Sequence, residues 1–75
     1  MREAGDMSDR VSGVVRWFNQ ARGYGYINGD DGAEVRVTRE AIDDLTFVTE
    51  GMRVTYVPAL DTDGTVHAEH VRVVS

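Results

Sequence analysis

Apolar and polar residues alternate along most of this sequence, which is the pattern of β-strands with one buried face. The alternation is clearest after residue 33, where Val35 and Val37 share one face of a predicted strand and Glu34, Arg36 and Thr38 share the other. Clusters of glycine, asparagine and aspartate separate such segments and are typical of turns. The pattern predicts five strands, over residues 11–19, 23–28, 34–38, 52–57 and 65–74.

The connection between the third and fourth predicted strands does not alternate. Ala41 and Ile42 are expected to form a short helical turn, and Leu45 and Val48 to anchor the segment to the core. The fourth strand is expected to end at Pro58, because proline cannot donate to a sheet ladder. Alternate side chains of that strand should share one face, those of Met52, Val54 and Tyr56.

The buried face can be identified from the sequence in the second predicted strand but not in the first. The first has apolar residues at both parities, so its period alone does not choose the buried face. In the second, Tyr24 and Tyr26 point one way, while Gly23, Gly25 and Ile27 point the other. The glycines allow another strand to pack closely behind, which leaves the tyrosine rings on the opposite face.

Composition limits the architecture. The chain has 75 residues, one proline and no cysteine, which excludes a large multidomain enzyme and a disulfide scaffold. No apolar run approaches the ~20 residues of a membrane span, and the first residues lack the apolar core of a secretory signal. We expect a polar, disordered leader over 1–9, one domain over 10–75, and a cytoplasmic protein. Five short strands avoid open edges most economically by closing into an all-β, antiparallel barrel.

Charge is distributed unevenly along the chain. The formal net charge is −5, and every basic residue is arginine. Residues 10–39 carry five arginines and three acids, whereas residues 40–75 carry two arginines and seven acids. Because electrostatic fields fall off over ~8 Å at physiological salt, the first half can attract phosphate although the whole chain is acidic.

Aromatic residues and arginines gather in one short segment. Four of the six aromatic residues lie between positions 17 and 26, namely Trp17, Phe18, Tyr24 and Tyr26. Arg16 and Arg22 flank them. Aromatic rings stack on unpaired bases and guanidinium groups hold phosphates, so this combination suits single-stranded nucleic acid. The same rings could equally form barrel core, and the residue types alone leave both interpretations open.

The segment Arg16-Trp17-Phe18-Asn19, followed by Arg22-Gly23-Tyr24-Gly25-Tyr26-Ile27, resembles the bacterial cold-shock proteins and their first ribonucleoprotein motif. The resemblance continues through Ala41-Ile42 and the later Glu50-Gly51. It implies a five-stranded OB-fold barrel that binds single-stranded RNA or DNA with little sequence selectivity. It also implies that the rings of Trp17, Tyr24 and Tyr26 stack on bases, beside Phe18, and that Arg16 and Arg22 replace family lysines.

The second ribonucleoprotein motif departs from the family pattern. Where the family has Val-Phe-Val-His, this chain has Val35-Arg36-Val37-Thr38, followed by Arg39. An additional stacking aromatic of the family is replaced by leucine at Leu45. Each lost stacking ring costs ~1–3 kcal/mol, so we expect weaker binding, partly compensated by Arg36 and Arg39. About four arginine–phosphate contacts would give a log–log salt slope of about −3.

Two functions follow as hypotheses. The first is an RNA chaperone or transcription antiterminator of the cold-shock type, using Arg16, Trp17, Phe18, Arg22, Tyr24, Tyr26, Arg36, Thr38 and Arg39. The second is a protein-interaction module that has lost much of this binding and contacts an acidic partner in the transcription machinery. We expect no enzyme activity, cofactor, small-molecule substrate or membrane contact.

Two further patterns are set aside. Asp61-Thr62-Asp63-Gly64 is similar to the start of a calcium loop, but Arg72 stands where the bidentate glutamate is required. His67 and His70 are three residues apart on a predicted strand and should therefore face opposite sides, which argues against a shared metal.

Overall fold

The computed structural model describes residues 10–43 and 47–74. The predicted leader over 1–9 and the predicted anchor Leu45 lie outside the described residues. The elements, in chain order, are β1 (Val11–Asn19), β2 (Tyr24–Gly29), β3 (Glu34–Thr38), the 3₁₀-helix η1 (Arg39–Ala41), β4 (Arg53–Leu60) and β5 (Val66–Val73). The predicted helical turn is present, but it begins two residues earlier than the sequence suggested and ends at Ala41, so Ile42 lies outside it in an extended conformation.

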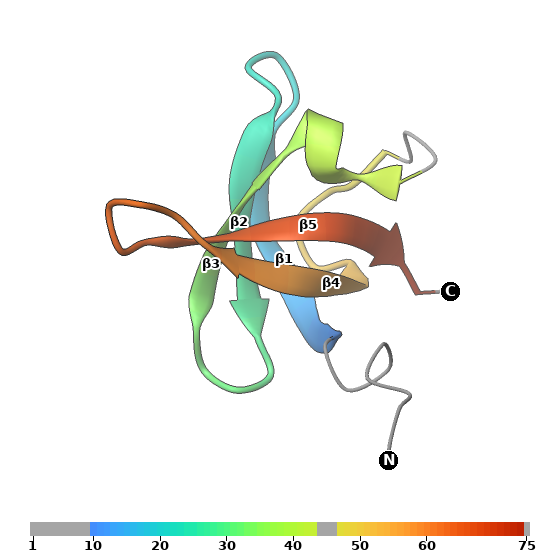
Figure 1. Ribbon diagram of the computed structural model, residues 1–75. Helices are drawn as coiled ribbons and strands as arrows, with labels where there is room; N and C mark the ends of the chain where they lie inside the picture. Colours follow the sequence, from blue (N-terminus) through green and yellow to red (C-terminus); the bar gives the residue numbers. More distant parts are fainter. Residues whose placement is uncertain (1–9, 44–46, 75) are drawn as a thin grey trace.

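The five strands close into a barrel in the order β1-β2-β3-β5-β4, which confirms the predicted all-β OB-type architecture. Four neighbouring pairs are antiparallel. The barrel closes through a short parallel contact between β3 and β5, with Arg36 opposite His67. Figure 1 shows β4 and β5 crossing the other strands steeply, with the β4–β5 turn projecting beyond the barrel.

The core consists almost entirely of β-branched and aromatic side chains, which suit a closed sheet. Val35 and Val37 are buried, as their alternation predicts, and so are Val48, Val54 and Tyr56. Met52 packs against this cluster from a partly buried position. Among the described residues no polar or charged residue is buried.

The prediction that β4 ends at Pro58 is wrong. The strand continues to Leu60, and Pro58 pairs with Ala68 of β5. β4 pairs with β1 only as far as Tyr56. At Pro58 the edge of β4 that faced β1 is therefore free, and no backbone N–H is needed there. A proline is tolerated where one strand edge is free.

A register shift in β1 explains why this strand is apolar at both parities. Val15 pairs with Ile27, but Trp17 pairs with Tyr26, so β1 holds one additional residue between them. Such a bulge exchanges the two faces of a strand. Val15 is buried in the core before the bulge, whereas Trp17 after the bulge lies on the face of Tyr26.

Two glycines allow β1 and β2 to approach and turn. A Cβ on Gly25 would lie 2.7 Å from the Cα of Phe18 and still closer to the backbone oxygen of Trp17. Gly23 has a φ of 77°, in the left-handed region. Its amide donates to the backbone oxygen of Asn19 at 2.7 Å, which closes the β1–β2 connection.

We expect Gly25→Ala to destabilise the protein by about 1–3 kcal/mol, because the added methyl group overlaps the β1 backbone. Asn28→Ala, an exposed change on the same strand, should alter the free energy of unfolding by less than about 0.5 kcal/mol. Urea denaturation of both variants measures the difference. Equal stabilities would show that β1 moves freely away from β2.

Candidate nucleic-acid interface

The structure brings the three predicted stacking rings together on the outer side of β1 and β2. The centroid of Trp17 lies 5.5 Å from that of Tyr24 in an edge-on arrangement and 5.4 Å from that of Tyr26 in a tilted one. All three side chains are half-buried, and none belongs to the buried core. The rings therefore form one compact cluster, which we call the aromatic triad.

Phe18 takes a different position from its neighbour. It pairs with Gly25 and packs against the core from a partly buried position. Because the bulge sends Trp17 outward, the next residue along β1 points inward. Phe18 therefore points to the opposite face of β1 from the aromatic triad.

Arg36 and Thr38 extend the aromatic triad onto β3. Tyr26 pairs with Arg36, and Tyr24 pairs with Thr38. The guanidinium carbon of Arg36 lies 5.6 Å from the centroid of Tyr24, which is a cation–π distance. Within the described part of the chain no ion pair engages Arg36. The residue that replaces an aromatic of the family pattern thus leans over a ring of the triad.

Arg16 lies beside the triad but is engaged by a carboxylate. Its Nη1 donates to Oε2 of Glu34 at 2.5 Å, and both side chains are about half exposed. Surface pairs of this kind contribute little stability. The pair nevertheless lowers the positive charge that Arg16 can offer to a phosphate.

The remaining two predicted arginines differ from each other. Arg39 donates to the backbone oxygen of Gln20, and its guanidinium packs over Gly23. Its backbone amide also donates to the oxygen of Gly23 at 2.8 Å, so Arg39 closes the β1–β2 loop. Arg22 is exposed on that loop, where its backbone amide donates to Oδ1 of Asn19 at 3.0 Å. Among the described residues no ion pair engages its guanidinium group.

Phe47 is an exposed aromatic that the sequence analysis did not select. Its relative exposure is 65%, whereas the adjacent Val48 is buried. The side chain of Gln20 donates to the backbone oxygen of Val48, which holds this segment against the β1–β2 loop. The sequence could have indicated this exposure, because a core position for Val48 turns the adjacent Phe47 side chain outward.

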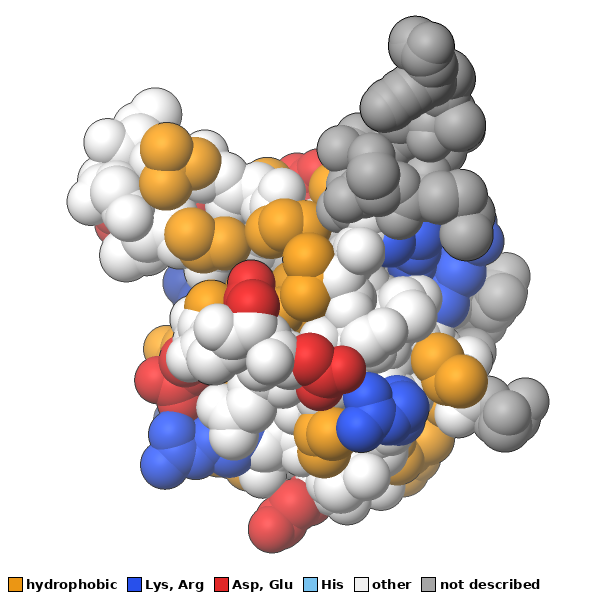
Figure 2. Space-filling view, turned by 90° about the horizontal axis from the view of Figure 1, so that it is seen from below, with side chains coloured by type: hydrophobic (Ala, Val, Ile, Leu, Met, Phe, Trp, Pro, Cys, Tyr) orange, Lys and Arg blue, Asp and Glu red, His pale blue; other side chains and the backbone are white. Residues whose placement is uncertain are grey.

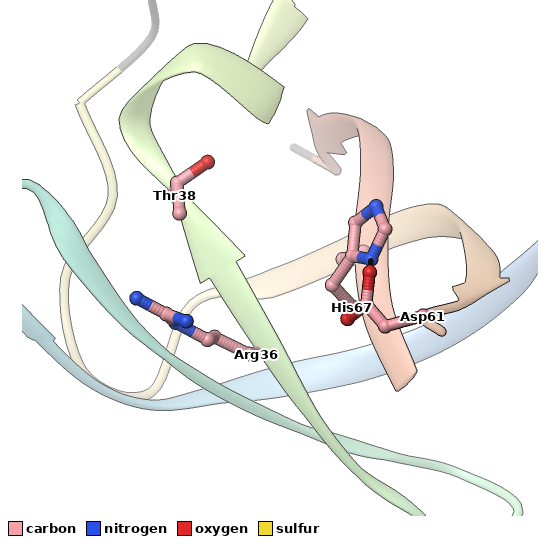
Figure 3. A pocket seen from close by; sticks show the side chains of 5 residues that line it. Arg36, Thr38, Asp61 and His67 are labelled. Atoms are coloured by element: carbon pink, nitrogen blue, oxygen red, sulfur yellow. Dashed lines mark ion pairs between the residues drawn. The ribbon is translucent and has the colours of Figure 1, made fainter. Parts of the chain in front are cut away.

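Two hollows lie on either side of Arg36. The first, of about 260 Å³, is lined by Arg36, Thr38, Asp61, His67 and Ala68. Figure 3 shows Arg36 extending away from the ion pair of His67 with Asp61. The second, of about 390 Å³, is lined by Tyr26, Ala33, Glu34, Arg36, Asp63, Thr65 and Val66. Asp61 and Asp63 of the β4–β5 hairpin therefore lie beside Arg36, at the edge of the surface that carries the aromatic triad.

Charges of both signs alternate over the end of the barrel near the β2–β3 turn. Figure 2 shows arginine and acidic side chains interspersed there, with no large area of one sign. Arg53 pairs with Asp30 at 3.1 Å. Among the described residues, this end of the barrel offers a polyanion no concentrated positive charge.

His67 is held by two carboxylates. Its Nδ1 lies 2.8 Å from Asp61, and its Nε2 lies 3.0 Å from Glu69. The hydrogen bond to Glu69 has the largest effect on the pKa of His67 and raises it above the ordinary value of 6.5; the hydrogen bond to Asp61 raises it further. His70 approaches a different acid, Asp43, at 3.6 Å. The two histidines thus have separate partners, and the described residues contain no cluster suited to a metal ion.

The predicted turn at Asp61–Gly64 is present. The amide of Gly64 donates to the backbone oxygen of Asp61 at 3.0 Å, and the hydroxyl of Thr65 donates to Asp63 at 2.7 Å. The Thr65 hydroxyl and amide lower the pKa of Asp63. The Asp63 carboxylate therefore stabilises the turn, whereas the Asp61 carboxylate also holds His67.

We expect NMR titration to place the pKa of His67 above its ordinary value, and Glu69→Gln to lower it. Because protonated His67 is favoured in the folded state, its contribution to stability is complete below pH ~6.5 and is lost as the pH rises through the folded-state pKa. His67→Gln should remove this part of the pH dependence of unfolding. A Glu69→Gln variant with an unchanged His67 titration would contradict the assigned cause.

Within the described residues no helix is long and apolar enough to cross a membrane. The fold is shared with the solved structure of Drosophila Unr CSD456, with a TM-score of 0.75 at 13% sequence identity. The match covers the whole of this chain and 32% of that longer chain.

Sequence relatives agree with the fold. The chain is 36% identical to major cold shock protein CspA of Pseudomonas aeruginosa, over 91% of this chain and 100% of that protein. It is 40% identical to cold shock protein CspA of Rhizobium meliloti, over 81% of this chain and 94% of that protein. The model of the 'Cold-shock' DNA-binding domain family matches residues 11–74. The chain therefore belongs to the cold-shock domain family of nucleic-acid-binding proteins.

Proposed function

We propose that this protein binds extended single-stranded RNA or DNA on the aromatic triad of Trp17, Tyr24 and Tyr26, and acts as an RNA chaperone. The observation that carries the proposal is the assembly of three rings outside the core, beside Arg36. Bases stack on such rings for ~1–3 kcal/mol each, with little dependence on sequence. Stacking competes with base pairing, so a protein of this kind opens weak RNA structure, and transcription antitermination would follow from that activity.

The affinity should be lower than that of a relative with aromatic residues in the second ribonucleoprotein motif. Arg36 and Thr38 offer a guanidinium plane and a methyl group where stacking rings are expected. Phe47 would supply one exposed ring from the β3–β4 connection. One added ring offsets only in part the loss of the rings expected at Arg36, Thr38 and Leu45.

The arginine contacts should also be fewer than the sequence suggests. Arg39 is engaged by the β1–β2 loop and Arg16 by Glu34. Arg22 and Arg36 remain as the phosphate-contacting arginines. The alternative, an interaction module for an acidic protein, would present the same arginines and aromatic rings to that partner.

Binding of a short oligothymidine should quench the fluorescence of Trp17, which is the only tryptophan. Tyr24→Ala combined with Tyr26→Ala should weaken binding at least tenfold, because two stacking surfaces are removed. Tyr24→Phe combined with Tyr26→Phe keeps both rings and should bind as the unchanged protein does. Circular dichroism checks that both variants fold. Unquenched emission at tens of micromolar oligothymidine in low salt would favour the protein-partner alternative.

The salt dependence of binding measures how many arginines contact phosphates. Each phosphate contact contributes about −0.7 to the log–log slope for single strands, so Arg22 and Arg36 predict a slope of about −1.4. Glu34→Gln releases Arg16 and should steepen the slope by about 0.7. Asp30→Asn, which breaks the separate ion pair with Arg53, is the matched control and should leave the slope unchanged. A slope near −3 for the unchanged protein would show that Arg16 and Arg39 leave their partners on binding.

A further inference from the structure

The contacts of His67 suit only one protonation state of its ring. Each ring nitrogen faces a carboxylate, Asp61 at 2.8 Å and Glu69 at 3.0 Å. A neutral imidazole carries one N–H and one lone pair, whereas an imidazolium donates from both nitrogens. Loss of the proton would therefore direct a lone pair at a carboxylate. The arrangement of the three side chains is complete only when His67 is charged.

This cluster of Asp61, His67 and Glu69 borders the proposed binding surface. His67 on β5 is the register partner of Arg36 on β3, at the one point where these two strands pair. Both residues line the same hollow, together with Thr38 and Asp61. On its other side Arg36 reaches the ring of Tyr24. Only the Arg36 side chain therefore separates this cluster from a strand of nucleic acid bound on the aromatic triad.

The charge of the cluster depends on one proton. Asp61 follows β4 and Glu69 lies on β5, and together with protonated His67 they carry a net charge of −1. Without the proton the net charge is −2. Arg36 on β3 is the cation that shares the hollow, and Asp63 on the β4–β5 turn adds a further carboxylate to the neighbouring hollow beside Arg36. A phosphate backbone approaching Arg36 meets stronger repulsion when His67 is neutral.

We propose that the protein takes up a proton on His67 when it binds single-stranded nucleic acid, so that affinity falls as the solution becomes more alkaline; this rests on the function proposed above. Linkage makes the effect reciprocal, because a bound polyanion favours the charged ring as much as the charged ring favours the polyanion. The hydrogen bonds to Glu69 and Asp61 raise the pKa of His67, and histidine is the side chain whose ordinary pKa already lies close to physiological pH. Small changes in pH would then adjust how firmly the strand is held.

The test is a series of oligothymidine titrations followed by Trp17 fluorescence, between about pH 5.5 and pH 8 at constant ionic strength. The affinity of the unchanged protein should fall about two- to fivefold over this range, the effect expected of one exposed charge. His67→Gln keeps a neutral hydrogen-bonding side chain and should make the affinity independent of pH. The only other histidine is His70, which has a φ of 52° and contacts Asp43. His70→Asn tolerates that backbone conformation and should retain the pH dependence.

The outcomes distinguish failure of the proton-uptake inference from failure of the proposed nucleic-acid binding. An unchanged pH dependence in His67→Gln, or its loss in His70→Asn, overturns the inference while the binding function stands. Binding by the unchanged protein with no pH dependence has the same meaning. No binding at any pH in this range overturns both the proposed function and the inference. A pH dependence lost only in His67→Gln supports them together.

Discussion

The one-residue bulge in β1 is the constraint on which the candidate interface depends. Strict alternation would place Trp17 on the same side as Val15, inside the barrel. The additional residue between Val15 and Trp17 exchanges the faces, so that the indole meets Tyr26 on the outer side and Phe18 turns toward the core. One irregularity in a single strand pairing thus converts a buried tryptophan into a surface ring. Without it the two tyrosines would have no third partner.

Close backbone approach and loop closure hold this arrangement in place. Gly25 opposite Phe18 leaves no space for a side chain, so the two strands lie against each other where the rings cluster. At the end of the same hairpin, Arg39 fastens the loop through Gln20 and Gly23. The interface is therefore built on a short hairpin that is fixed at both the strand and the loop. Rings held in this way lose little conformational entropy when a base stacks on them.

The sequence predicted the fold well, and also the clustering of Trp17, Tyr24 and Tyr26, because both depend on local patterns. It missed the inward turn of Phe18 and the exposed ring of Phe47. Alternation located the strands, and two linked motifs located the rings. The electrostatics of the surface could not be predicted in the same way. Arg16 meets Glu34 across 18 positions, and His67 reaches the surface only because the barrel closes β5 against β3. The continuation of β4 through Pro58 was also missed, since it depends on where the pairing with β1 stops.

The distribution of acids around the surface suggests how an acidic chain handles a polyanion. Glu34 neutralises Arg16, and the β4–β5 hairpin brings Asp61 and Asp63 to the hollows beside Arg36. Charge attraction is thereby kept small, which would leave stacking as the main source of affinity in the proposed function. Stacking forms and breaks base by base, whereas a dense positive groove would hold the phosphate chain along its whole length. A surface with strong rings and weak net charge would suit the proposed chaperone activity, in which RNA is released as readily as it is bound.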